Sequence, residues 1–129
     1  MIALLREYDI PAWYTLVSTH SFSNQDMRPS IYVFNHAIIA YELKDKQLRF
    51  ADLTTDYFQT GVLPSGDSDA WGLVIRPGET QVRRLPNHAL DPAVTRIEID
   101  AKATLDPEGN LQVDLHTVQH GTIAGHWRE

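Results

Sequence analysis

The alternation of apolar and polar residues near the C-terminal end most narrows the folds open to this chain. Apolar residues occupy every second position from 97 to 105, and the pattern resumes at 111–115 after the turn Asp-Pro-Glu-Gly-Asn. Strand side chains point to opposite faces with a period of two, and this turn sequence is typical of a type I turn. The pattern predicts a β-hairpin with one face in a core, the other in water, and His116 opposite Asp100.

Other segments carry weaker patterns of the same kind. Residues 1–10 have a helical apolar stripe that Pro11 ends, and the aromatic and β-branched residues of 12–17 predict a strand. Two more hairpins are predicted, one pairing 32–43 with 47–53 and the other pairing 71–75 with 80–85. The polar stretch 18–30 predicts a surface loop, and the stretch 60–70, rich in Gly, Pro and Ser, predicts a linker. The expected fold is α+β and predominantly antiparallel β, with a short N-terminal helix remnant and hairpins in a sheet or sandwich-like arrangement.

Composition excludes several classes of function. The chain has 129 residues, 11 Lys and Arg against 17 Asp and Glu, a net charge of −6 and no cysteine. Negative charge disfavours a nucleic-acid partner, because phosphate binding needs a basic patch. No apolar run approaches the roughly 20 residues of a transmembrane helix, and no signal peptide is recognised. Without cysteine the chain supplies no disulfide, thiolate metal ligand or thiol nucleophile.

The most informative pair of residues is His36 and Asp52. If the hairpin loop between their strands has an odd number of residues, both side chains lie on one face of the sheet. A register that places Ile38 opposite Asp52 makes His36 and Asp52 diagonal neighbours, so that a carboxylate oxygen can reach Nδ1. A carboxylate there fixes the imidazole tautomer and stabilises its cation, as a general base requires. The alternative is a cross-strand polar pair at a sheet edge.

Several segments resemble bacterial transglutaminase-like proteins, which have a papain-like thiol-enzyme fold. Residues 4–12, LLREYDIPA, resemble the family's LLR-x-x-G-I-P-A segment, although Asp9 stands where the family usually has glycine. Residues 34–36, FNH, are similar to its histidine strand, and 52–54, DLT, to its D-x-T aspartate strand. Residues 61–64, GVLP, and 71–74, WGLV, resemble the continuation G-x-L-P … A-L-V of multidomain members.

The resemblance implies a division of the chain and a site. Residues 1–64 would be the C-terminal part of a transglutaminase-like core, and 65–129 a β-rich appended region that could pack with it as one unit. His36 would be the general base and Asp52 its orienter. The family's catalytic cysteine lies upstream of the position of Met1, so the chain is expected to be a truncated domain that is inactive alone.

The resemblance also implies partners. The parent would act on a peptide or protein substrate by thiol acyl transfer or peptidase-type chemistry, without a cofactor or metal. Neither nucleic-acid binding nor membrane insertion is expected, and a bacterial parent could be exported or periplasmic. An exposed N-terminal apolar segment, with Ile2, Leu4 and Leu5, would favour a homo-oligomer.

Other interpretations remain open. The chain could be a non-catalytic β-rich binding or scaffold module in which His36 and Asp52 are incidental. A hydroxyl could replace the thiol, with candidates at Ser18, Ser21 and Ser23, but no Gly-x-Ser-x-Gly motif exposes one. A metal site could use His116, His120 and His126, but their spacing matches no zinc finger.

Overall fold

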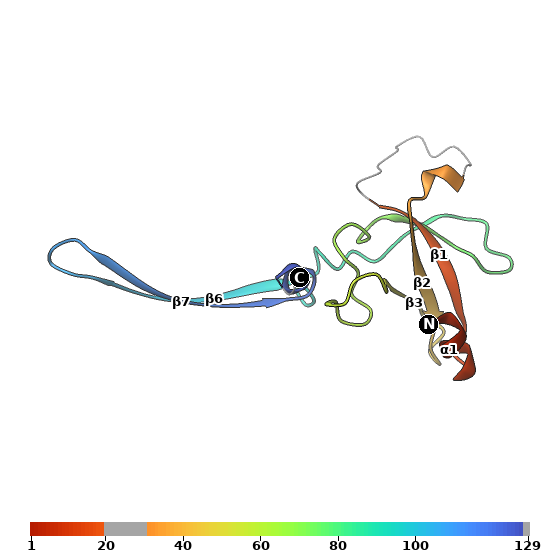
Figure 1. Ribbon diagram of the computed structural model, residues 1–129, viewed down its shortest axis with the longest axis horizontal. Coiled ribbons are helices and arrows are strands. Elements are labelled where there is room, and N and C mark those ends of the chain that lie inside the picture. Colours follow the sequence, from red (N-terminus) through yellow and green to blue (C-terminus); the bar gives the residue numbers. More distant parts are fainter. Residues whose placement is uncertain (20–30, 128–129) are drawn as a thin grey trace.

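The computed structural model describes residues 1–19 and 31–127, and its strands form two antiparallel sheets (Figure 1). The larger sheet has the order β3-β2-β1-β4-β5, from β1 (Ala12–Ser18), β2 (His36–Glu42), β3 (Leu48–Ala51), β4 (Trp71–Val74) and β5 (Arg83–Arg84). The smaller sheet is the hairpin of β6 (Arg96–Leu105) and β7 (Leu111–His120). The helices are α1 (Ile2–Glu7), the 3-10 helix η2 (Ile31–Val33) and α2 (Thr122–His126). The predicted α+β, mainly antiparallel fold is confirmed.

One face of the larger sheet carries the main core. Strand alternation brings buried apolar side chains from β1, β2, β3 and β4 to this face, and the loop before β4 and the segment after β5 cover them. The buried members are Val17, Ile38, Ala40, Phe50, Leu63, Ala70, Val74 and Leu85. Because β4 pairs with β1, the sheet extends across the predicted boundary between residues 64 and 65.

Helix α1 packs on the opposite face of the same sheet. Ile2 and Leu5 contact a second cluster formed by Ala12, Ile39 and Tyr41. The expectation that the whole apolar stripe of this helix is exposed is therefore wrong for Ile2 and Leu5, because the sheet itself provides the surface that covers them.

The hairpin of β2 and β3 is shorter than predicted. The predicted strand over 32–43 begins only at His36, since 31–33 form a 3-10 turn and the Asn35 side chain bonds to Thr19. The partner strand ends at Ala51 rather than at residue 53. The pair next to the hairpin loop is Glu42 and Leu48, so the loop has five residues. An odd number of loop residues is what places His36 and Asp52 on the same face of the sheet.

The stretch 60–70 is part of the core and not the predicted linker. Leu63 and Ala70 are 0% and 1% exposed, and the side chains of Asp67 and Ser68 are also buried. The prediction is wrong because the open face of β2 and β3 needs an apolar cover, and this stretch is the segment that supplies it.

The C-terminal hairpin forms in the predicted register but without the predicted core. Ala101 lies opposite Leu115, and the hairpin projects away from the larger sheet (Figure 1). Every residue of β6 is exposed, as is β7 up to Thr117, so no described element covers the apolar face. The expectation of one buried face is therefore wrong: alternation ensures that the apolar side chains share a face, but only another element can bury it.

The polar loop expected at 18–30 lies, from residue 20 onward, outside the described residues. Within the described ranges, no helix is long and apolar enough to cross a membrane.

Candidate active site

His36 and Asp52 meet at the end of the β2–β3 hairpin. Ile39 pairs with Ala51, so the same register places Asp52, the residue after β3, opposite Ile38. This is the predicted diagonal arrangement, and Nε2 of His36 lies 3.1 Å from Oδ2 of Asp52. That distance is a hydrogen bond between a quarter-exposed imidazole (25%) and a buried carboxylate (4%).

The imidazole nitrogen in this contact differs from the predicted one. Asp52 was expected at Nδ1, but it lies at Nε2. A carboxylate accepts hydrogen bonds, so Nε2 carries the proton and the lone pair of the neutral ring is on Nδ1. No described residue makes a hydrogen bond to Nδ1 of His36.

Thr54 holds Asp52 in the orientation that this contact needs. The backbone N–H and the hydroxyl of Thr54 donate to Oδ1 of Asp52 at 2.9 and 2.8 Å. The local sequence Asp-x-Thr thus forms an Asx-type turn that leaves Oδ2 for His36. This is the physical reason for an aspartate and a threonine two residues apart at the end of a strand.

The charge state of Asp52 follows from these contacts. Burial favours the neutral acid and raises its pKa, but the two hydrogen bonds from Thr54 and the hydrogen bond and charge of His36 outweigh burial. The pKa of Asp52 is therefore lowered from its ordinary value of 3.8. Asp52 is a carboxylate at neutral pH, which is the state that can orient His36.

A second carboxylate, Asp67, lies beside the same imidazole. Its Oδ2 is 3.8 Å from Nε2 of His36, and its side chain is 3% exposed. The sequence prediction missed Asp67, because the Ser, Gly and Asp residues around it have the composition of a linker. No local pattern relates residue 67 to residue 36, and only the packing of this loop on the sheet brings them together.

His36, Asp52 and Asp67 are also the residues that could hold a metal ion. One possible ligand atom of each lies within 4.8 Å of the others. Imidazole nitrogen and carboxylate oxygen are ligands that zinc and similar divalent ions accept. Among the described residues this is the one group of three such side chains, and it does not include His116 or His120.

The C-terminal histidines occupy other surroundings. His116 lies opposite Asp100, as predicted, on the exposed hairpin. His120 pairs with Glu98 at 3.4 Å, and His126 belongs to α2. The hydroxyl candidates are also separate: Ser18 ends β1 with a buried side chain, and Ser21 and Ser23 lie outside the described residues.

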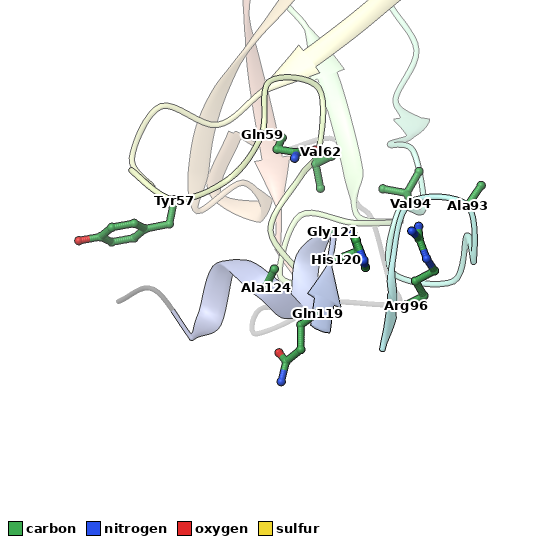
Figure 2. Close-up of a pocket in the computed structure, with 10 residues that line it drawn as sticks. All are labelled: Tyr57, Gln59, Val62, Ala93, Val94, Arg96, Gln119, His120, Gly121 and Ala124. Atoms are coloured by element: carbon green, nitrogen blue, oxygen red, sulfur yellow. The ribbon is translucent and has the colours of Figure 1, made fainter. Parts of the chain in front are cut away.

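Cavities lie at the base of the C-terminal hairpin and beside α1. The cavity at the base of the hairpin has a volume of about 340 Å³, and its lining residues, drawn in Figure 2, include Arg96, His120, Val62 and Gly121. His36, Asp52 and Asp67 do not line it. A second cavity, of about 430 Å³, lies beside α1 and has Asp52 on its wall, among mainly apolar neighbours such as Leu5, Ile39 and Phe58.

Comparisons with known proteins return no relative of this chain. No family model matches it, and no match is found among the curated proteins or the solved structures. Any functional conclusion therefore depends on the motifs in the sequence and on the geometry of the site.

Proposed function

We propose that His36 and Asp52 are the general-base half of a transglutaminase-like site for thiol acyl transfer or peptide hydrolysis. The observation that carries the proposal is the 3.1 Å contact between His36 Nε2 and Asp52 Oδ2. The D-x-T sequence that the resemblance singled out is the one whose threonine orients this aspartate. The chain has no cysteine, so its share of the site is the base and its orienter.

The chemistry follows from the positions of the two ring nitrogens. Asp52 holds the proton on Nε2, and Nδ1 accepts the proton of a thiol. The thiolate attacks the carbonyl carbon of an amide and forms a tetrahedral intermediate. The imidazolium then returns its proton to the leaving amine, and a thioester remains. Asp52 stabilises the imidazolium between the two transfers, and water or a second amine then releases the acyl group.

A second function is favoured by a different observation. The apolar face of the β6–β7 hairpin is exposed along its whole length, and exposed apolar surfaces of this kind mark interaction sites. A non-catalytic β-rich binding module would use this face and would not need His36. Its large side chains are 47–69% exposed: Ile97, Ile99, Leu105, Leu111, Val113 and Leu115.

One experiment separates the two functions. A polypeptide in which a transglutaminase-like helix with Gly-Asp-Cys precedes Met1 is assayed for amide hydrolysis and amine incorporation, beside the 129-residue chain alone. We expect turnover only with the added cysteine, and at least a roughly 100-fold loss in a His36→Ala variant, because general-base catalysis contributes about 10²–10⁴-fold. His116→Ala is the matched control, since His116 lies on the exposed hairpin.

Two results would contradict the proposal. Hydrolysis by the 129-residue chain that depends on His36 would require a hydroxyl nucleophile. Turnover in the extended polypeptide that survives His36→Ala would remove the base from the reaction and favour the binding module.

A further inference from the structure

The side chain of Asp67 is buried, whereas a carboxylate in a surface loop is normally exposed to water. It is 3% exposed, although Ser, Gly and Asp surround it in the sequence. Burial of an ionised carboxylate is unfavourable unless donors or positive charge face it. The imidazole of His36 is one group that faces it, because Nε2 lies 3.8 Å from Oδ2 of Asp67.

Hydrogen bonds hold the backbone around Asp67 in place. The N–H groups of Asp67 and Ser68 both donate to the carbonyl of Pro64, at 3.0 and 2.9 Å, and the N–H of Ala70 donates to the carbonyl of Asp67 at 3.1 Å. The hydroxyl of Ser68 accepts the backbone N–H of His88 at 3.1 Å. Asp67 is thus set in a hydrogen-bonded turn that lies between two core residues, Leu63 and Ala70.

The two carboxylates act on the same edge of the ring in different ways. Asp52 is at hydrogen-bond distance from Nε2, whereas Asp67 at 3.8 Å is too far for a hydrogen bond and acts through its charge. A flip of the imidazole would place a carbon instead of Nε2–H at this edge, so that neither carboxylate would face the N–H group. Together they hold the ring in one orientation more firmly than Asp52 does alone.

We propose that Asp67 is a positioning residue for His36: with Asp52 it keeps the proton on Nε2, so that Nδ1 faces the nucleophile. This role rests on the proposed function, in which His36 is the base. Asp67 need not touch substrate, and it acts only through the orientation and tautomer of the imidazole.

The test measures the His36 tautomer in the chain as it is. Long-range ¹H–¹⁵N NMR of the neutral imidazole should show mainly the Nε2–H form, and Asp67→Asn should raise the share of the Nδ1–H form by about twofold or more, because a charged acceptor is replaced by a neutral one. Asp69→Asn is the matched control. Asp69 belongs to the same loop, but its half-exposed carboxylate faces Arg84 at 3.6 Å. An unchanged tautomer balance in a folded Asp67→Asn variant would overturn the proposal.

A second measurement needs no substitution and covers the case of a variant that does not fold. In the wild-type chain, the carboxyl ¹³C resonance of Asp67 should show a step at the pH where the His36 ring protons titrate. The carboxyl of Asp69 should show none. A flat Asp67 resonance across that range would show that its carboxylate does not sense the ring, and would overturn the proposal.

Activity separates this inference from the proposed function. In the cysteine-bearing polypeptide, Asp67→Asn should lower kcat about tenfold and leave KM nearly unchanged, since it alters the base and not substrate binding. Unchanged kcat in an active polypeptide would overturn the role of Asp67 alone. An inactive polypeptide would overturn the proposed function, while the two NMR measurements would still report whether Asp67 acts on the ring.

Discussion

Leu63, which is fully buried, donates its backbone N–H to Nδ1 of His88 over 3.2 Å. A histidine nitrogen can accept this hydrogen bond only without a proton of its own, so the fold requires neutral His88. Burial lowers the pKa of His88 below its ordinary value of 6.5, and the charge of Asp91 opposes this only in part. Leu63, in the segment that covers the core, is thus connected by a hydrogen bond to His88, a titratable residue in the chain after β5.

Acid should therefore weaken the fold through His88. Below about pH 6.5 the unfolded chain takes up a proton that folded His88 resists, so the free energy of unfolding falls as the pH falls through this range. Urea unfolding at pH 7.5 and at pH 5.5 measures the change. In His88→Gln the loss over this interval should be smaller, whereas His116→Gln on the exposed hairpin should behave as wild type; equal losses in all three proteins would contradict the prediction.

Removal of the Thr54 hydroxyl should raise the pKa of Asp52. Thr54→Val deletes the hydrogen bond of 2.8 Å to Oδ1 and keeps the backbone bond. The loss should lower the free energy of unfolding at neutral pH by about 1 kcal/mol. Because the pKa of Asp52 is lowered in the folded state, the stability it adds is present above pH 3.8 and is lost as the pH falls through the folded pKa.

The measurement for Thr54 is a ¹³C titration of the Asp52 carboxyl together with unfolding at two pH values. The difference between variant and wild type should shrink in acid. Thr104→Val, on exposed β6, is the control and should leave the Asp52 titration unchanged. A Thr54→Val variant with an unchanged Asp52 titration would show that the hydroxyl does not orient the carboxylate.

Gly72 should not tolerate a methyl group. A Cβ at this position in β4 would lie 3.0 Å from Cδ2 of Leu85 and 3.2 Å from Cγ2 of Thr15. We expect Gly72→Ala to lower the free energy of unfolding by about 1–3 kcal/mol, as overpacking does. Gly66→Ala is the control, because a Cβ added there would have no atom of the described residues within 4 Å apart from its own chain neighbours. Similar denaturation midpoints for both variants would mean that the packing around Gly72 accommodates a methyl group.

Self-association through the N-terminal segment remains a prediction. Met1 and Leu4 are 59% and 54% exposed, although their neighbours Ile2 and Leu5 pack on the sheet. Sedimentation should show association that increases with concentration and weakens in Leu4→Ser. Ile99→Thr tests the alternative apolar surface, since Ile99 is 64% exposed on the hairpin. Association lost only in Ile99→Thr would place the contact on the hairpin, and a monomer at all concentrations would contradict both.

Local patterns determined most of the secondary structure and two of the three residues of the site, His36 and Asp52. The strands of β1 and of the C-terminal hairpin were predictable because period-two alternation and turn sequences act over a few residues. The contact between His36 and Asp52 was also predictable, because a hairpin with an odd loop places residues of one parity on one face. Which imidazole nitrogen faces Asp52 was not predictable, because it depends on the side-chain rotamer of His36, which the strand register does not fix.

Tertiary packing decided the remainder. Composition marked 60–70 as a linker, yet Leu63 and Ala70 cover the core and carry Asp67 to His36, a contact between residues 31 positions apart that no local pattern encodes. The apolar face of β6 and β7 is the opposite case. Alternation determined which side chains share that face, but burial requires a second surface, and no described element of this chain lies against it.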